Sequence, residues 1–113
     1  MTTVDQFLKA LAMVESSDDP EAWGDAGRAM GRWQVHPARY YDELRRWDLV
    51  PEVSATWDQT VAIMLREIWE EYYPIYSPTQ IAMYWHLGHF TDPTRPDWDA
   101  KYAARFAAEL AKA

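Results

Sequence analysis

The chain has 113 residues, of which 49% are hydrophobic and 26% charged, and this length allows one compact domain over residues 1–113 but no second domain of any size. Its net charge of −7 argues against nucleic acid as the main partner, because no basic patch is present to neutralise phosphates. The absence of cysteine excludes disulfides, thiolate nucleophiles and thiolate zinc sites.

The N-terminal stretch MTTVDQFLKALAMVESS does not have the pattern of a secretory signal. It lacks a basic n-region, and Asp5 and Lys9 interrupt its apolar run. Nowhere does the chain approach the roughly 18 consecutive apolar residues that a membrane span needs. We expect a monomer without a membrane span. Its compartment stays open, since action on a cell wall would require export, delivery by a phage, or a longer protein of which this chain is a fragment.

The first predicted helix begins at a capping box formed by Thr3 and Gln6. The next residues repeat at the spacing of one helical face, and the run SSDDP after it ends the helix. That face consists of Val4, Phe7, Leu8, Leu11 and Glu15. Glu15 therefore lies in the last turn and points toward the buried side.

The helical period disappears between residues 21 and 34, where Gly24, Gly27 and Gly31 recur at short intervals. This pattern predicts a short β-hairpin with its turn at residues 25–27. A hairpin of this length needs neighbours to stabilise it, and we expect Trp23 and Trp33 to supply packing on its two arms.

Four further helices are predicted, over residues 37–47, 57–73 and 78–87 and after a cap at Asp97, with a connector at 48–55. The core face of the last helix consists of Trp98, Tyr102, Phe106 and Leu110. Pro37 and Pro78 suit first helical positions, and Thr56 and Ser77 open capping boxes. The 57–73 helix has the widest apolar arc and should be central. The predicted fold is mainly α, of the α+β kind, with about five helices, one small hairpin and a cleft.

Two carboxylates are candidates for chemistry. On an apolar helical face, Glu15 would be desolvated, which would raise its pKa and suit it to general acid catalysis; the alternative is a partly exposed glutamate that reaches water. Asp25 could face Glu15 across the hairpin turn, and two carboxylates flanking a cleft are the minimum for glycosidic bond hydrolysis. Taken alone, however, Asp25 fits ordinary turn chemistry better.

The other side chains with chemical potential favour sugar binding over metal binding. His36, His86 and His89 do not form a ligand spacing with an acidic residue, so we expect no metal and no cofactor. Flat aromatic rings pack against the C–H faces of sugars, and core packing is the competing role of each. The candidates of this kind are Trp23, Trp33, Trp85 and Trp98.

Together these residues resemble the active-site run of goose-type lysozymes and the related soluble lytic transglycosylases. Those families carry an ES pair at a helix end, a GD-containing hairpin and a G-L-M-Q-V/I segment. The chain has ES at residues 15–16, WGDAG at 23–27 and GRWQV at 31–35. Gln59-Thr60 and the long helix to Pro74 are similar to the central helix of the family, and YWHLG at 84–88 falls where the family has A-Y-N-x-G. The resemblance covers residues 3–88 in the same order.

The resemblance implies a lysozyme-like fold and a role for each matching residue. Glu15 would be the general acid, Ser16 the serine that follows it, Asp25 the aspartate that positions water and Gln34 a residue of the saccharide cleft. The chain departs from the pattern where Arg32-Trp33 replace Leu-Met, where His36 replaces a second aspartate, and where residues 84–86 replace A-Y-N. We expect the substrate-binding residues to be Ser16, Trp33, Gln34, His36, Tyr84, Trp85 and His86.

The implied activity is a glycosidase, either a muramidase or a lytic transglycosylase, that cleaves β-1,4 bonds of peptidoglycan. A water held by Asp25 would give hydrolysis, and attack by a substrate hydroxyl would give an anhydro product. Two alternatives stay open. One is a saccharide-binding or structural module without turnover, as in a phage particle or secretion apparatus. The other is an enzyme acting on a chitin-like polymer, which an acidic protein would repel less than it repels an anionic wall.

Overall fold

The computed structural model describes residues 1–52 and 54–113, and this part of the chain contains five α-helices and one two-stranded antiparallel hairpin. Residue 53, in the predicted connector, lies outside the described residues. The mainly α class is confirmed, as is the small hairpin. The elements are α1 (Val4–Ser16), β1 (Trp23–Gly24), β2 (Ala29–Met30), α2 (Pro37–Arg46), α3 (Trp57–Tyr72), α4 (Pro78–Leu87) and α5 (Ala100–Lys112).

The helix starts are set by short-range hydrogen bonds that the sequence already indicates. Reciprocal capping boxes open α1, α3 and α4, each with a Thr or Ser oxygen accepting from the backbone of a glutamine three residues on. The predicted cap of the last helix is wrong, because α5 is capped by Asp99, whose side chain accepts from Tyr102 N. Asp97 instead contacts His89 and Thr91 in the preceding loop.

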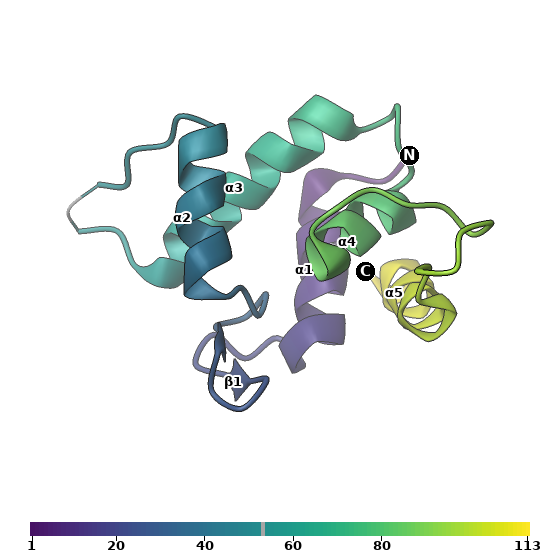
Figure 1. Cartoon of the computed structure of the whole chain (residues 1–113), viewed down its shortest axis with the longest axis horizontal. Helices are drawn as coiled ribbons and strands as arrows, with labels where there is room; N and C mark the ends of the chain where they lie inside the picture. Colours follow the sequence, from purple (N-terminus) through teal and green to yellow (C-terminus); the bar gives the residue numbers. More distant parts are fainter. Residues whose placement is uncertain (53) are drawn as a thin grey trace.

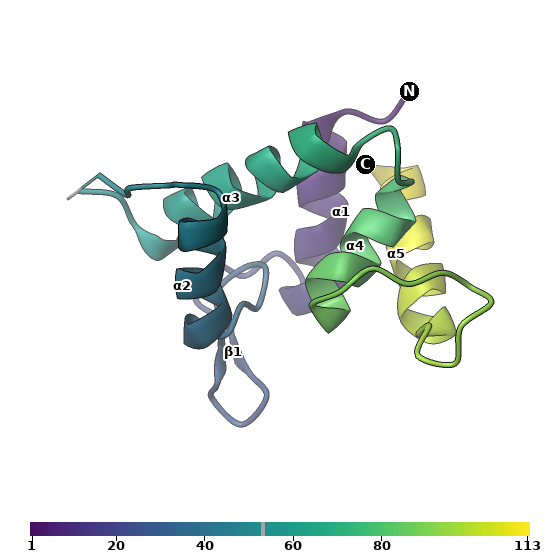
Figure 2. The ribbon, with the colours of Figure 1, turned by 45° about the horizontal axis from the view of Figure 1, so that its top comes forward.

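The core lies between α1, α3 and α5. Phe7 of α1 stacks on Trp69 of α3 with ring centroids 4.8 Å apart, and meets Phe106 of α5 edge-on at 5.8 Å. Figures 1 and 2 both place α1 between α2 on one side and α5 on the other, with the hairpin beyond the C-terminal half of α1. As predicted, α3 is the longest helix, and it packs against α1, α2 and α4.

The hairpin pairs Trp23 with Met30 and Gly24 with Ala29, and a further bridge joins Met30 to Val35. The expectation for its two tryptophans is half right. Trp33 is buried and its Nε1 donates to Leu8 O of α1 at 2.9 Å, whereas the Trp23 side chain is 64% exposed. Trp33 therefore fastens the hairpin region to the core, and Trp23 does not.

The backbone of the segment from Glu15 to Pro37 is unusual. Six non-glycine residues of the described chain have a positive φ, and all but Asp48 lie in this segment. The other five are Ser17, Asp18, Asp25, Ala26 and Gln34. Such conformations persist only where side-chain contacts and packing hold them, so this segment takes its shape from its surroundings.

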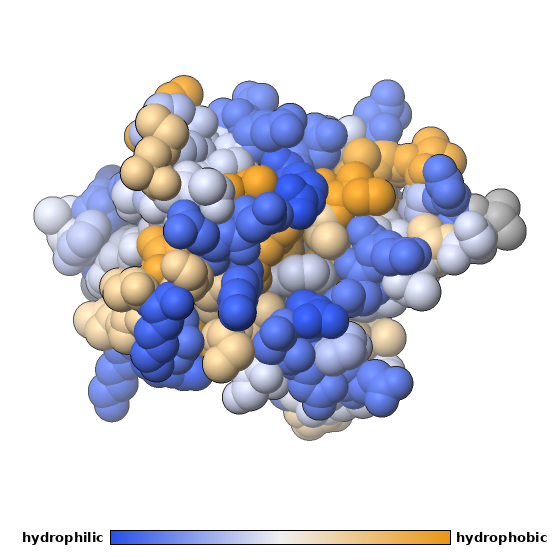
Figure 3. Space-filling model, turned by 180° about the vertical axis from the view of Figure 1, so that it is seen from behind, coloured by the Kyte–Doolittle hydropathy of each residue, from blue (hydrophilic) through white to orange (hydrophobic). Residues whose placement is uncertain are grey.

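The face of the molecule seen from behind is mainly hydrophilic. Figure 3 shows polar residues over most of one face, with hydrophobic residues gathered in smaller patches between them. Of the described helices, none combines the length and the apolar character needed to cross a membrane.

Candidate functional site

A cavity of about 330 Å³ opens where the end of α1, the hairpin region, the start of α2 and the end of α4 meet. It brings together six of the nine residues predicted to form the site. These six are Glu15, Asp25, Gln34, His36, Trp85 and His86, and the remaining lining comes from Ala29, Val35 and Arg39. Larger depressions lie near Phe90 (about 560 Å³) and along residues 49–63 (about 670 Å³), but none of the acidic residues that line them is buried.

Glu15 is the partly buried carboxyl group of this cavity. Burial raises its pKa, and the rise is partly offset by a hydrogen bond from Tyr102 and by the positive potential of His86 and two arginines. The Tyr102 hydroxyl donates to Glu15 Oε2 at 2.6 Å. Because desolvation dominates, Glu15 keeps its proton to a higher pH than an ordinary glutamate, as a general acid requires.

Tyr102 reaches Glu15 from α5, 87 positions along the chain. Burial and the neighbouring carboxylate raise the pKa of Tyr102 strongly, so the phenol stays protonated and acts as the donor. The His86 ring stacks on it with centroids 3.9 Å apart, and His86 Nε2 lies 3.1 Å from Asp99 Oδ2. Through these contacts the end of α4 and the start of α5 fix the position of the Glu15 carboxyl.

Asp25 and His36 form a second polar pair in the cavity lining. Asp25 Oδ2 lies 3.1 Å from His36 Nε2, and Asp25 Oδ1 lies 3.8 Å from Arg28. Both side chains of the Asp25–His36 pair are about half exposed, at 55% and 46%. Asp25 is therefore not only a turn residue, because its carboxylate engages the histidine that begins α2.

Gln34 uses its amide nitrogen for structure. Nε2 donates to Gly31 O at 2.8 Å and to Ala22 O at 3.2 Å, which closes the loop after β2. The amide oxygen lies against Gly24, where an added Cβ would stand only 2.2 Å from it. A glycine at position 24 thus leaves room for the Gln34 side chain at the cavity wall.

Arg39, which sequence reasoning did not single out, supports the α4 side of the cavity. Its guanidinium donates to the carbonyl oxygens of Tyr84 and Trp85 at the end of α4 and lies 4.6 Å from the Trp85 ring. The buried carboxylate of Glu43 lies 3.8 Å from Arg39 Nε. Arg39 therefore satisfies carbonyls of the last helical turn and holds Trp85 in place.

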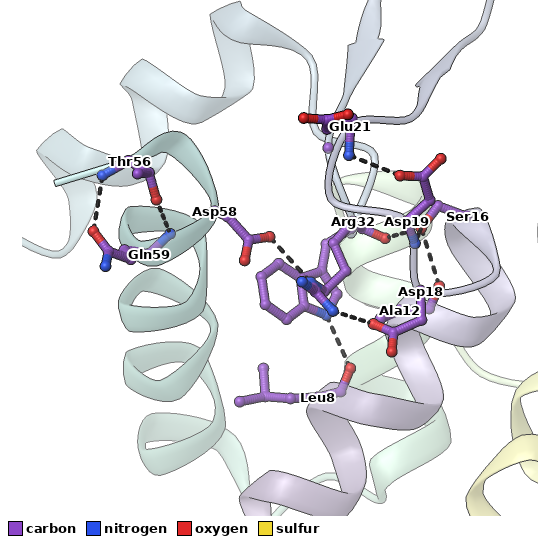
Figure 4. A network of polar contacts seen from close by, with 12 residues as sticks. Leu8, Ala12, Ser16, Asp18, Asp19, Glu21, Arg32, Thr56, Asp58 and Gln59 are labelled. Carbon is purple, nitrogen blue, oxygen red and sulfur yellow. Dashed lines mark hydrogen bonds and ion pairs between the residues drawn. The ribbon is translucent and has the colours of Figure 1, made fainter.

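Three predicted site residues lie outside the cavity. The Ser16 hydroxyl donates to Arg32 O at 2.6 Å and accepts from Asp19 N at 3.0 Å, so it shapes the turn after α1 (Figure 4). Trp33 is buried against α1, as described above. The buried Tyr84 hydroxyl donates to Glu43 at 3.1 Å. Each of the three has a structural role, and the structure does not bring them to the site.

Arg32 explains one departure from the family-like pattern. It forms ion pairs with Asp18, just after α1, and with Asp58, in the first turn of α3 (Figure 4). All three side chains are only about one-third exposed. Arg32 thus connects the segment that carries Asp25 and Gln34 to both neighbouring helices.

Two residues of the site, Tyr102 and Arg39, escaped prediction for different reasons. Tyr102 was expected on the buried face of the last helix, and a buried tyrosine needs a partner for its hydroxyl, which was the available signal. The identity of that partner depends on tertiary packing. Arg39 on a short helix carries no comparable signal.

Among the described residues, no group of three or more His, Cys, Asp or Glu side chains is placed to hold a metal ion. No protein family, curated protein or solved structure matches this chain.

Proposed function

We propose that this protein is a lysozyme-like glycosidase that cleaves β-1,4 bonds of an amino-sugar polymer, with peptidoglycan as its first candidate substrate. The observation that carries the proposal is the position of Glu15, a partly buried carboxyl of raised pKa that lines a cavity and accepts a hydrogen bond from Tyr102. The resemblance to goose-type lysozymes and soluble lytic transglycosylases adds the substrate class.

In the proposed reaction, Glu15 gives its proton to the glycosidic oxygen as that bond breaks and positive charge develops on the sugar ring. Tyr102 donates to the carboxylate that forms, which stabilises it at the moment of proton transfer. Asp25 and His36 line the same cavity and supply the polar groups that can engage the attacking water or hydroxyl. His86 lies in the wall that the sugar would contact, and the buried Trp85 supports that wall from the core side.

The direct test compares wild type with Glu15→Gln on purified peptidoglycan. The substitution keeps the shape and the ability to accept from Tyr102 but removes the proton, so turnover should fall about 10²–10⁴-fold. Glu70→Gln, at an exposed position of α3, is the matched control and should retain wild-type turnover. Full activity of Glu15→Gln would exclude this mechanism. In the products, mass spectrometry distinguishes hydrolysis (reducing ends) from transglycosylation (anhydro ends).

A saccharide-binding module without turnover is the second candidate, and one observation favours it. The Asp25 carboxylate is already engaged by His36 and Arg28, so it is less available to hold a water by itself. Calorimetric binding of peptidoglycan fragments by a wild type that releases no product would establish this reading. The same assays on chito-oligosaccharides would show whether a chitin-like polymer is preferred.

A further inference from the structure

His36 lies at the cavity wall, and its imidazole is not used to cap the helix that follows it. It is the N-cap residue of α2, yet its side chain makes no capping hydrogen bond. Pro37 follows at the first helical position, where its lack of an N–H leaves one fewer unpaired backbone donor at the start of α2. The imidazole instead turns to Asp25.

From this arrangement we propose that His36 is the base that activates the attacking water, and that Asp25 is a positioning residue that acts through His36. This inference rests on the proposed glycosidase function and specifies its hydrolytic half. It places the acid and the base on different elements that line one cavity, Glu15 at the end of α1 and His36 at the start of α2.

The contact with Asp25 determines which ring nitrogen can accept a proton. Asp25 Oδ2 lies 3.1 Å from Nε2, which favours the tautomer with its proton on Nε2 and its lone pair on Nδ1. Within the described chain, no side chain other than Asp25 forms a hydrogen bond or ion pair with the His36 ring. Nδ1 is therefore open to a water molecule, and the half-exposed ring gives water access to it.

The proposed step is hydrolysis of the glycosidic bond. Water forms a bond from its oxygen to the anomeric carbon while the bond from that carbon to the glycosidic oxygen breaks. One proton of the water passes to His36 Nδ1, and the proton of Glu15 passes to the leaving oxygen. Exchange with solvent then returns both groups to their starting forms. The product carries a reducing end, and the attacking water enters on the face opposite to the leaving group.

The first experiment replaces His36 by glutamine, which retains a polar contact for Asp25 but cannot take up the proton. We expect kcat on soluble peptidoglycan oligosaccharides to fall about 10²–10³-fold with KM changed less than about threefold. The control is His89→Gln, because His89 is also paired with an aspartate (Asp97, 2.6 Å) but lies outside the cavity. It should retain wild-type kcat.

A second measurement separates a base from a residue that only shapes the cavity. Azide can attack the anomeric carbon without giving up a proton, so it should restore turnover of His36→Gln and form a glycosyl azide of inverted configuration. Azide should leave Glu15→Gln inactive, because the leaving oxygen still needs a proton. A His36→Gln protein that azide does not rescue would overturn the assignment of His36 as a base.

The role of Asp25 is tested by a double-mutant cycle. If Asp25 acts through His36, Asp25→Asn alone lowers kcat, but adding it to His36→Gln lowers kcat no further. Independent, multiplicative losses would instead make Asp25 a base in its own right and overturn the proposal.

The outcomes also distinguish this inference from the function on which it rests. An inactive Glu15→Gln with a fully active His36→Gln would overturn the role of His36 and leave the glycosidase proposal standing. Anhydro products from wild type would do the same, since no water is then activated. A fully active Glu15→Gln would overturn both.

Discussion

A carboxyl group that loses its solvent becomes costly to ionise, and for Glu15 this cost belongs to the folded state alone. Burial raises its pKa above the ordinary value of 4.5, so the folded protein holds this proton to a higher pH than the unfolded chain does. The resulting contribution to stability is complete below that ordinary value and is lost as pH rises through the folded pKa. At neutral pH, the ionisable Glu15 should therefore lower the free energy of unfolding of the protein.

The corresponding prediction is that Glu15→Gln is more stable than wild type at neutral pH by about 0.5–2 kcal/mol, because glutamine does not ionise. Below the ordinary value of 4.5 the two proteins should have similar free energies of unfolding. Urea denaturation at acidic and neutral pH measures both quantities. If the difference in free energy of unfolding between Glu15→Gln and wild type narrowed as pH rose, the prediction would be contradicted. The difference between Glu70→Gln and wild type should not widen with pH.

At the same scale, the success of sequence reasoning depended on how far apart the interacting residues are. The position of Glu15 in the last turn of α1 follows from local periodicity and was predicted. Its bond to Tyr102 joins residues 87 positions apart and was not. By residue type, Trp33 could be a sugar platform or, more commonly, a core residue. Its burial and the hydrogen bond from its Nε1 to Leu8 O place it in the core.

At the scale of the hairpin segment, backbone conformation and lack of space both disfavour a side chain at Gly31, whereas only backbone conformation does so at Gly27. Both have positive φ, +82° and +84°, which disfavours any side chain. A Cβ on Gly31 would also stand 3.1 Å from the Trp57 ring of α3, whereas one on Gly27 would meet nothing within 4 Å. Because Gly31 has no side chain, the segment can lie close to Trp57 of α3.

We therefore expect Gly27→Ala to lower the free energy of unfolding by about 1–2 kcal/mol, the usual penalty of left-handed backbone. Gly31→Ala should lower it by about 1–3 kcal/mol more, because Trp57 has to move. Urea denaturation of the two variants gives the difference. Equal losses would mean that Trp57 yields freely and that the contact does not position the segment.

Elements were predicted well where their ends are coded locally. The three capping boxes place the starts of α1, α3 and α4 because donor and acceptor lie three residues apart. The last cap was misplaced by two residues, since Asp97 and Asp99 are equally suited by type. The loop decides between them, as Asp97 is occupied by His89 and Thr91.

At the scale of the whole molecule, charge opposes the proposed substrate. The protein carries −7, and the peptides of peptidoglycan add negative charge to the polymer. Such repulsion is screened by salt, with a Debye length of about 10 Å at 0.1 M. The cavity itself has cationic neighbours, including Arg39. Long-range repulsion and local attraction therefore predict opposite effects of salt on kcat/KM for an anionic substrate.

If the net charge dominates the encounter, kcat/KM on anionic peptidoglycan fragments should rise severalfold as salt increases from low ionic strength. On uncharged chito-oligosaccharides it should stay constant, which provides the control within one protein. A fall with salt on the anionic fragments would show that the cationic groups of the cavity dominate instead. Initial rates across a salt series measure both.

The left-handed residues of the Glu15–Pro37 segment also indicate where a substitution could make this protein more stable. Three of them hold their conformation with side-chain contacts, Asp18 to Arg32, Asp25 to His36, and Gln34 to the loop carbonyls. Ala26 has only a methyl group, so no polar side-chain contact of its own offsets the cost of its left-handed backbone. A substitution at Ala26, at the tip of the hairpin and next to Asp25, can therefore raise the thermal stability of the protein without altering a contact that the cavity lining uses.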